Sequence, residues 1–173
     1  ERDISLKSGR RVADALTDIG ATVVIREPDS KLLANIKKDA PDVIWPCLHG
    51  ASGEDGALRD ILALSGVPFV GATGDSARLA WDKSIAKILV AKEGIQTPAS
   101  VTLPKETFRE LDADGVLKAI TTSISLPVVV KPAKSGSAQG VTIVRDSAEL
   151  SRAMIDAYVY CDVAIIEKFV AGT

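Results

Sequence analysis

Hydrophobic positions in the first third of the chain alternate between helical and strand spacing. Over Ser8–Ile19 they fall on one helical face, and Gly20 follows at a position typical of a helix end. Short continuous apolar runs, which favour buried strands, alternate with further helical segments. This alternation predicts an α/β domain with a parallel sheet covered by helices and ligands beyond the carboxyl ends of the strands. The predicted helices are 8–19, 31–38 and 57–65, and the predicted strands are 21–25, 42–48 and 68–70.

The rest of the chain has a different pattern. A long helical segment ends at Gly94, and two β-rich runs flank a stretch of small residues, which predicts a hairpin with a flexible flap. Another helix and a final apolar strand complete an α+β domain, separated from the first by Gly71 and Gly74. The predicted segments are a helix at 76–93, an extended segment at 97–103, strands at 127–131 and 141–145, a helix at 148–158 and a strand at 163–168.

Composition and charge narrow the function classes. The 173 residues are 46% hydrophobic and 25% charged, which suits a globular core and excludes a disordered chain. The formal net charge of -2 is spread without clusters, so we expect neither nucleic acid nor a membrane surface as a partner. The chain has no apolar run of membrane-spanning length and does not start with a signal peptide, so we expect a cytoplasmic protein that binds small molecules.

The few cysteine and histidine residues exclude two kinds of site. Cys47, Cys161 and the single histidine, His49, cannot supply the ligand spacing of a zinc module. The chain also lacks the G-x-S-x-G elbow of a serine hydrolase. His49 can still contact a substrate.

The segment Lys131–Gly140 carries the most informative chemical pattern. A strand ends in Lys131 and opens into a loop of small residues. Glycines let backbone N–H groups approach anionic oxygens, serine adds a hydroxyl donor and lysine supplies a point charge, so the loop can wrap a polyphosphate. It is neither a Walker A loop nor a dinucleotide fingerprint. A mobile hairpin turn without a ligand is the alternative.

Charged and apolar residues also alternate abruptly at the end of the last predicted strand. Glu167 and Lys168 follow an apolar run, and Phe169 and Val170 come next. A glutamate and backbone groups can read the edge of a purine while the apolar pair lines a slot for the ring. An edge strand with a solvated tip is the alternative.

Two further segments have both a structural and a functional interpretation. The loop His49–Gly56 enters a helix with acidic residues, so capping explains much of it, and His49 is either a structural histidine or a substrate contact. Lys83, within Trp81–Ser84, would alone be interpreted as part of a solvated helix face.

Five motifs in this order resemble the D-alanine–D-alanine ligase family of the ATP-grasp superfamily. Glu1–Gly9 resembles E-R-x-[VI]-S-L-x-S-G, and His49–Gly56 resembles H-G-x-x-G-E-D-G. Gly66–Gly71 resembles G-[IV]-P-[YF]-[VT]-G, Asp82–Lys83 the family's D-K, and Val130–Gly140 its V-K-P-x-x-x-G-S-x-x-G. The matches cover nearly the whole chain.

The resemblance implies a Rossmann-like pre-ATP-grasp domain followed by an ATP-grasp subdomain. We expect an N-terminal substrate-binding domain at 1–73, a central ATP-grasp subdomain at 74–167 and the start of a truncated C-terminal domain at 168–173. It also implies a fragment without the first strand and most of the C-terminal domain, because the family's next motifs are missing at both ends. The family's Mg²⁺ ligands, which can also hold Mn²⁺, are expected in that C-terminal part, so no metal ligand is assigned in this chain.

The implied activity is the ATP-dependent ligation of two D-alanines for peptidoglycan synthesis, through an acyl phosphate, by a homodimer. Glu1 matches the acidic residue that holds the first D-alanine's ammonium, and Ser137, which we also expect in the ATP site, matches a serine that hydrogen-bonds Glu1. His49 matches a histidine beside the same substrate. The residues implied to bind ATP are Lys83, Lys131, Gly136, Ser137, Glu167, Lys168, Phe169 and Val170.

Two alternatives stay open from the sequence. Another ATP-grasp ligase, which joins D-alanine to D-lactate or acts on L-amino acids, would share the lysines and the flap. A non-catalytic nucleotide-binding module would bind ATP through Lys83 and Lys131 without releasing ADP in response to an amino acid.

Overall fold

The computed structural model describes residues 1–172 and divides after Arg78 into two compact units. Unit 1 runs from Glu1 to Arg78, and unit 2 begins at Leu79. The division falls inside helix α5 (Gly74–Trp81), five residues beyond the domain boundary predicted at 73. Of the third domain predicted at 168–173, Thr173 lies outside the described residues.

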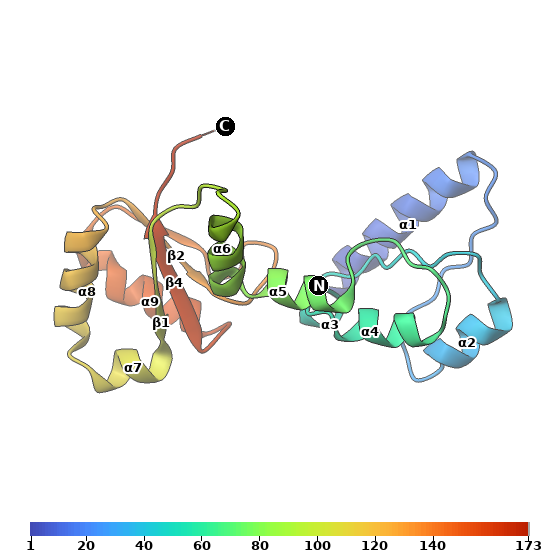
Figure 1. The fold of residues 1–173 in the computed structure, drawn as a ribbon, viewed down its shortest axis with the longest axis horizontal. Coiled ribbons are helices and arrows are strands. Elements are labelled where there is room, and N and C mark those ends of the chain that lie inside the picture. Colours follow the sequence, from blue (N-terminus) through green and yellow to red (C-terminus); the bar gives the residue numbers. More distant parts are fainter. Residues whose placement is uncertain (173) are drawn as a thin grey trace. The chain divides into compact units, whose positions relative to one another are not determined.

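Unit 1 is built mainly of helices (Figure 1). The predicted helices at 8–19, 31–38 and 57–65 are present, the first of them extended back to the second residue of the chain. A one-turn helix also forms inside the loop after His49. The helices are α1 (Arg2–Asp18), α2 (Leu32–Asp39), α3 (Ala51–Glu54) and α4 (Ala57–Leu64).

The parallel sheet predicted for unit 1 is reduced to one bridge in the described part of the chain. Ile44 donates to the carbonyl of Pro68 and accepts from the N–H of Val70, both at 2.9 Å, which pairs Ile44 with Phe69 in parallel. The prediction of a strand at 21–25 was wrong, because this run finds no strand to pair with in residues 1–78 and leaves Val24 57% exposed. An apolar run forms a strand only where another strand completes its hydrogen bonds.

Unit 2 contains a four-stranded antiparallel sheet in the order β1-β4-β2-β3 among the described residues. The last strand in sequence therefore lies in the middle, between the first strand and a hairpin. This hairpin is the one predicted around residues 132–140, and β4 has the bounds that the sequence predicts. The strands are β1 (Ser100–Pro104), β2 (Val128–Pro132), β3 (Thr142–Val144) and β4 (Val163–Lys168).

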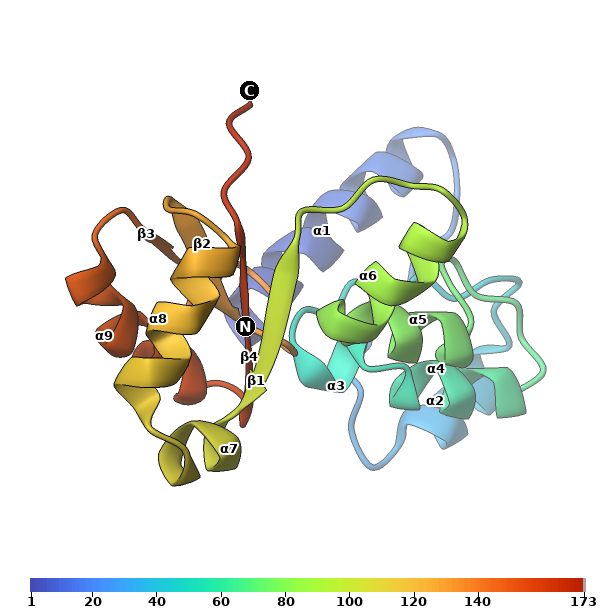
Figure 2. The ribbon, with the colours of Figure 1, turned by 60° about the vertical axis from the view of Figure 1, so that its left-hand side comes forward.

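Helices cover both faces of this sheet. The helices α7 (Lys105–Glu110), α8 (Ala113–Ser123) and α9 (Leu150–Tyr158), with the 3₁₀ turn η1 (Ser147–Glu149), lie on one side, and α6 (Lys83–Lys92) lies on the other (Figures 1 and 2). The core lies between the sheet and α8 and α9. Its buried side chains include Leu117, Ile120, Val128, Val130, Leu150, Met154 and Ile166.

The single helix predicted at 76–93 was wrong in one respect, because it is broken into α5 and α6. Asp82 adopts an extended conformation between them, and its carboxylate accepts hydrogen bonds from the N–H groups of Ser84 and Ile85. An aspartate that caps a new helix in this way satisfies backbone donors that a continuous helix would bond internally. Because of this break, α6 begins beside the flap loop, which connects β2 and β3.

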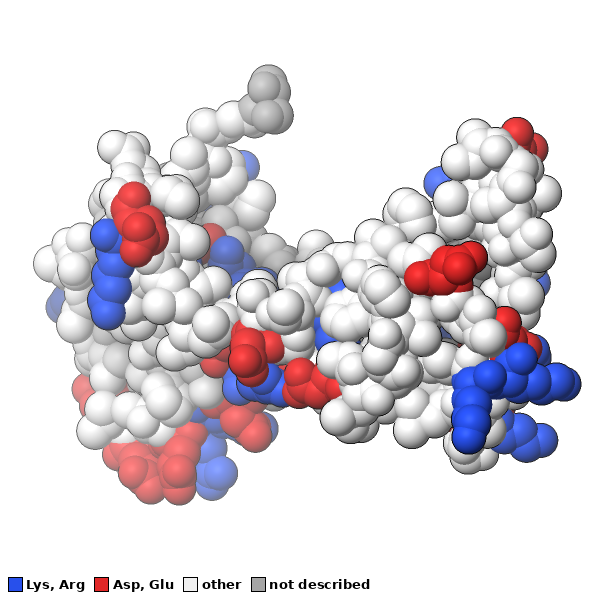
Figure 3. Space-filling model, turned by 45° about the vertical axis from the view of Figure 1, so that its right-hand side comes forward, with Lys and Arg blue, Asp and Glu red and all other residues white. Residues whose placement is uncertain are grey.

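Most of the face that Figure 3 shows is uncharged, with basic side chains gathered at its lower right and mainly acidic ones at its lower left. In the described chain, no helix is both long enough and apolar enough to cross a membrane.

Candidate functional site

Side chains alternate between the two faces of the sheet along β2 and β4, and this places a charged pair on the face opposite the core. Val130 and Ile166 point into the core, so their neighbours Lys131 and Glu167 point to the other face. In the antiparallel register Lys131 lies opposite Ile165, which makes Glu167 its diagonal neighbour. Two residues that the sequence singled out separately therefore meet.

Glu167 is the centre of a buried ionic cluster. One carboxylate oxygen accepts from the Lys131 ammonium, and the other accepts from the Lys87 ammonium at 2.9 Å. The three side chains are 10%, 21% and 16% exposed for Glu167, Lys131 and Lys87 respectively. Lys87 also donates to the carbonyl of Pro98 at 2.8 Å. A carboxylate so far from water requires such partners.

The pKa of Glu167 reflects two opposing effects. Burial alone would raise it, because desolvation penalises the charged form. The hydrogen bonds and charges of Lys131 and Lys87 outweigh burial and hold the pKa of the Glu167 carboxyl below its usual value. The group is therefore an anion at neutral pH.

The start of α6 contacts the flap loop. The Lys83 N–H donates to the carbonyl of Ala133 at 2.9 Å, and the Lys83 ammonium donates to the carbonyl of Ser135 at 2.6 Å. Asp82 lies 3.5 Å from the Lys134 ammonium. Burial would raise the pKa of Asp82, but hydrogen bonds from Ser84 and Ile85 and the charge of Lys134 lower it. The helix start and the loop are thus tied together by charge-assisted contacts.

The flap loop between β2 and β3 contains left-handed backbone. Ser137 and Ala138 have φ of 51° and 56°, and Gly140 has φ of 68°. Ser137 is exposed and Gly136 is partly buried. A Cβ atom on Gly140 would come within 2.7 Å of the Tyr160 ring, so only glycine fits there. The loop keeps a defined turn while its tip stays open to solvent.

The residues at the end of β4 are held by contacts within unit 2. The Lys168 ammonium donates to the Ser125 carbonyl at 2.8 Å and to its hydroxyl at 3.0 Å, so this side chain secures the loop before β2. Phe169 is partly buried and has the Arg145 guanidinium 5.7 Å from its ring centre. Val170 is 66% exposed. Two apolar residues thus follow the charged pair at the end of β4.

A second group of predicted residues lies in unit 1. The Ser5 hydroxyl donates to the Glu1 carbonyl at 3.1 Å and accepts from the His49 N–H at 3.0 Å. The imidazole Nε2 of His49 lies 3.0 Å from the Ser8 hydroxyl. Gly50 has φ of 86°, and a Cβ atom there would lie 2.1 Å from the Glu1 carboxylate. Glu1 and His49, which are far apart in sequence, are therefore brought together against Gly50.

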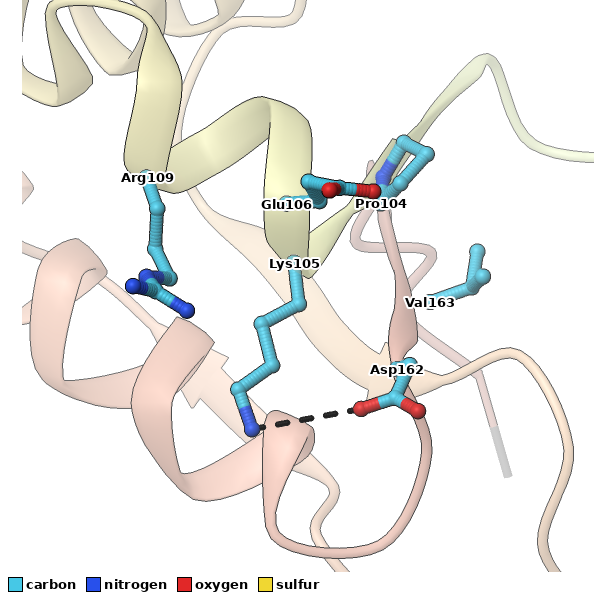
Figure 4. Close-up of a pocket in the computed structure, with 6 residues that line it drawn as sticks. All are labelled: Pro104, Lys105, Glu106, Arg109, Asp162 and Val163. Carbon is cyan, nitrogen blue, oxygen red and sulfur yellow. Dashed lines mark ion pairs between the residues drawn. The ribbon is translucent and has the colours of Figure 1, made fainter.

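A shallow pocket of about 430 Å³ lies elsewhere in unit 2 (Figure 4). Lys105 and Arg109 of α7 reach over it, and Lys105 forms a 3.9 Å ion pair with Asp162. Val163, the first residue of β4, also lines it, whereas Glu167 stands near the opposite end of that strand. Because none of the predicted site residues lines this pocket, it is not the site that the motifs indicate.

No group of three or more His, Cys, Asp or Glu side chains within residues 1–172 could hold a metal ion. We therefore assign no metal ligand among these residues and derive no step through a metal. In unit 2 the available chemistry is cationic: Lys83, Lys131 and Lys134 adjoin a loop of small residues. Such groups suit an anion with several oxygens, such as a polyphosphate.

Three residues belong to these clusters although the sequence did not single them out as candidate site residues. Lys87 stands four positions after Lys83, so both lie on one face of α6, and this spacing could have revealed it. Ser5 and Ser8 belong to the first motif at helical spacing from Glu1, but their contacts with His49 depend on the fold.

Comparison with known proteins gives consistent matches. Residues 89–173 match the family model described as D-ala D-ala ligase C-terminus. The D-alanine–D-alanine ligase of Gloeobacter violaceus is 36% identical over 99% of this chain and 55% of its own length. That of Moorella thermoacetica is 34% identical with the same coverage. The chain thus spans about half the length of these curated relatives.

Comparison with solved structures gives matches in the same family of ligases. The D-alanine–D-alanine ligase of Bacillus anthracis matches with a TM-score of 0.82 and 31% identity, over 99% of this chain and 54% of that one. Its complex with ATP matches with a TM-score of 0.80 and 28% identity, over 99% and 55% of the two chains. The VanG D-Ala:D-Ser ligase of Enterococcus faecalis matches with a TM-score of 0.66 and 35% identity, over 76% of this chain and 37% of that one.

Proposed function

Because the chain belongs to the D-alanine–D-alanine ligase family, we propose that the full-length protein joins two D-alanines at the expense of ATP. The observation that carries the proposal is the meeting of Lys131 and Glu167 on one sheet face, beside a loop tied to Lys83. These three residues come from three separate motifs, and a random set of surface charges would not converge in this way.

The chemistry requires such a cationic site. A carboxylate is a poor electrophile, so ATP converts the first D-alanine into an acyl phosphate that the amine of the second D-alanine attacks. The site has to neutralise phosphate charge and exclude water that would hydrolyse the intermediate. We assign phosphate binding to Lys83 and Lys131 and covering of the phosphates to the flap with Gly136 and Ser137.

We assign recognition of the adenine to the segment at the end of β4. Glu167 would accept a hydrogen bond from the purine edge, and the backbone of Lys168 would contribute to the same edge. Phe169 and Val170 would line the slot for the ring. The support for this assignment is that Phe169, which is partly buried, and Val170 follow Glu167 and Lys168 directly in the chain.

We assign binding of the first D-alanine to the cluster in unit 1. A carboxylate such as that of Glu1 suits the substrate's ammonium, and His49 lies in the same cluster. The pairing of Ser137 with Glu1 rests on the resemblance alone. Positive-φ Gly50 supports it, because only glycine leaves room for the Glu1 carboxylate in its present place.

The remaining assignments rest on the resemblance. They are a Rossmann-like substrate domain at 1–73, a central ATP-grasp subdomain at 74–167, and the start of a C-terminal ATP-grasp domain from 168. We further propose a cytoplasmic homodimer that serves peptidoglycan synthesis and uses ATP with Mg²⁺ or Mn²⁺. The likeness to a D-Ala:D-Ser ligase makes the acceptor amino acid the assignment that most needs a test.

The test is ADP release by the full-length protein with ATP and Mg²⁺. D-alanine alone is compared with D-alanine plus D-serine or D-lactate and with a panel of L-amino acids. Release with D-alanine alone, together with formation of the dipeptide, supports the proposal. Release only with another acceptor assigns a different ligase, and ATP binding without amino-acid-dependent release indicates a binding module.

Two variants separate the proposed roles. Lys131→Ala should weaken ATP binding by about 2 kcal/mol or more in titration calorimetry, because it removes a charged partner of the phosphates. Glu1→Ala should leave ATP affinity unchanged but raise the KM for D-alanine. Lys92→Met, at the exposed end of α6, removes a positive charge outside the cluster and serves as the control.

A further inference from the structure

Lys87 connects three parts of unit 2: the helix α6, the end of β4 and the segment before β1. It projects from α6 on the same face as Lys83, one helical turn later. Its ammonium donates to Glu167 Oε2 at 2.9 Å and to the carbonyl of Pro98 at 2.8 Å. With a side chain only 16% exposed, Lys87 is not a solvated surface lysine.

The charges of the cluster are unevenly matched. Two ammonium groups, from Lys87 and Lys131, share the single carboxylate of Glu167, and each uses a different oxygen. One cation is enough to neutralise this carboxylate. The other can therefore leave for a second anion without creating an unpaired buried charge, which would be costly.

The two lysines differ in what would hold them in place. Lys87 has a second acceptor in the Pro98 carbonyl, which fixes it beside Glu167. Lys131 lies on β2, the strand that leads directly into the flap loop, and its ammonium donates to Glu167. Lys131 is thus the ammonium placed to turn towards the phosphates under the flap.

We propose that Lys87 is a positioning residue, which keeps the Glu167 carboxylate paired and aimed at the purine edge while Lys131 moves to the phosphates of ATP. This inference rests on the proposed function. Lys87 itself needs no contact with the nucleotide. Without it, Lys131 would remain bound to Glu167, or Glu167 would be left as a buried anion without a partner. Either outcome opposes nucleotide binding.

The test measures the dissociation constants of ATP and ITP by titration calorimetry with the full-length protein. ITP has an oxo group in place of the 6-amino donor, so the ratio of the two constants reports how well Glu167 reads the base. Lys87→Met should weaken ATP binding about tenfold or more and reduce the preference for ATP over ITP. Lys87→Arg should retain most of the ATP affinity and most of the preference for ATP over ITP, since a guanidinium can also donate to two acceptors.

The control and the double variant separate positioning from general stability. Lys92→Met, on the same helix, should bind both nucleotides like the wild type. In a Glu167→Gln background the further change Lys87→Met should leave the ATP-to-ITP ratio unaltered, because there is no carboxylate left to position. If Lys87→Met does not fold, as judged by circular dichroism, Lys87→Gln replaces it in both backgrounds.

Two results would overturn the inference, and they differ from a failure of the proposed function. One is ATP affinity and ATP-over-ITP selectivity within twofold of wild type in Lys87→Met, while Lys131→Ala weakens ATP binding. The other is that Lys87→Met lowers the preference for ATP over ITP equally in the wild-type and in the Glu167→Gln background. If the wild-type protein does not bind ATP at all, the proposed function itself fails.

Discussion

Replacing Glu167 by glutamine tests how much the buried ionic cluster contributes to the stability of unit 2. The substitution keeps the shape of the side chain and removes its charge. One amide oxygen can still accept from one lysine, but the amide NH₂ then faces the second ammonium, donor against donor. Because all three side chains are at most 21% exposed, the loss resembles that of a broken buried pair, roughly 3 kcal/mol.

This loss should be large enough to measure. Unit 2 spans residues 79–173, which is 95 residues (173 − 78). For a unit of that size each kcal/mol lowers the midpoint of thermal unfolding by about 4–8 °C, so Glu167→Gln should lower it by about 12–24 °C. Urea unfolding at pH 7, followed by far-ultraviolet circular dichroism, gives the free energy directly. Glu93→Gln, an exposed change just after α6, is the control.

The pH dependence of the difference provides a second criterion. The pKa of Glu167 in the folded state lies below its ordinary value of 4.5. Its stabilising contribution is therefore complete above that ordinary value and is lost as pH falls through the folded-state pKa. The difference between wild type and Glu167→Gln should stay constant from pH 8 to about 5 and shrink below. A difference under about 1 kcal/mol at pH 7, or one that persists in acid, would refute the reasoning.

Three other changes test the backbone at Gly50 and the packing of the core of unit 2. Gly50→Ala should destabilise unit 1 by about 1–3 kcal/mol, because its φ of 86° is strained for any residue with a side chain. Gly20→Ala, at a φ of 89° in open space, should cost a similar amount in thermal unfolding, and an unchanged midpoint for Gly50→Ala would contradict the backbone argument. Met154→Ala should cost about 2–5 kcal/mol in urea unfolding, whereas Ile155→Ala, 57% exposed, should cost little; similar costs would place the core elsewhere. Tyr158→Phe should cost about 1 kcal/mol by removing a buried hydrogen bond to a β1 carbonyl, and an unchanged midpoint would show that this bond adds nothing.

Elements with a strong local pattern could be predicted from the sequence. The strand at 163–168 has its predicted bounds because its apolar run is continuous and ends at a charged pair. The helices α2, α4 and α9 follow the predicted segments to within two residues at most. The local pattern was sufficient for these elements because each carries its repeat of apolar positions within its own segment.

Elements that depend on distant partners could not be predicted. The helix α8 contains Gly115 and several β-branched residues, which are poor helix formers, and it forms because Leu117 and Ile120 pack into the core. The run at 21–25 has strand character but no pairing partner in residues 1–78. Asp82 did carry a capping signal, and giving that signal more weight would have separated α5 from α6.

The candidate site was predicted as a set of residues but not as a set of contacts. The motifs singled out Lys83, Lys131 and Glu167, and their roles with ATP remain predictions. That Lys131 is an immediate partner of Glu167 depends on the register between β2 and β4, which no local pattern encodes. The helical spacing from Lys83 places Lys87 on the same face of α6, but its contact with Glu167, 80 positions away, depends on the fold.

The central strand β4 has consequences for how mutations act along it. Ala164 and Ile166 face the core, whereas Ile165 and Glu167 point to the face that carries the charged cluster. Neighbouring residues of β4 therefore have different surroundings. A systematic substitution scan through Val163–Lys168 should impair folding at Ala164, Ile165 and Ile166 alike, because all three side chains are fully buried, and should disturb the ionic cluster at Glu167. Inserting or deleting one residue would exchange the two faces, and this short segment should therefore tolerate substitution better than any change in length.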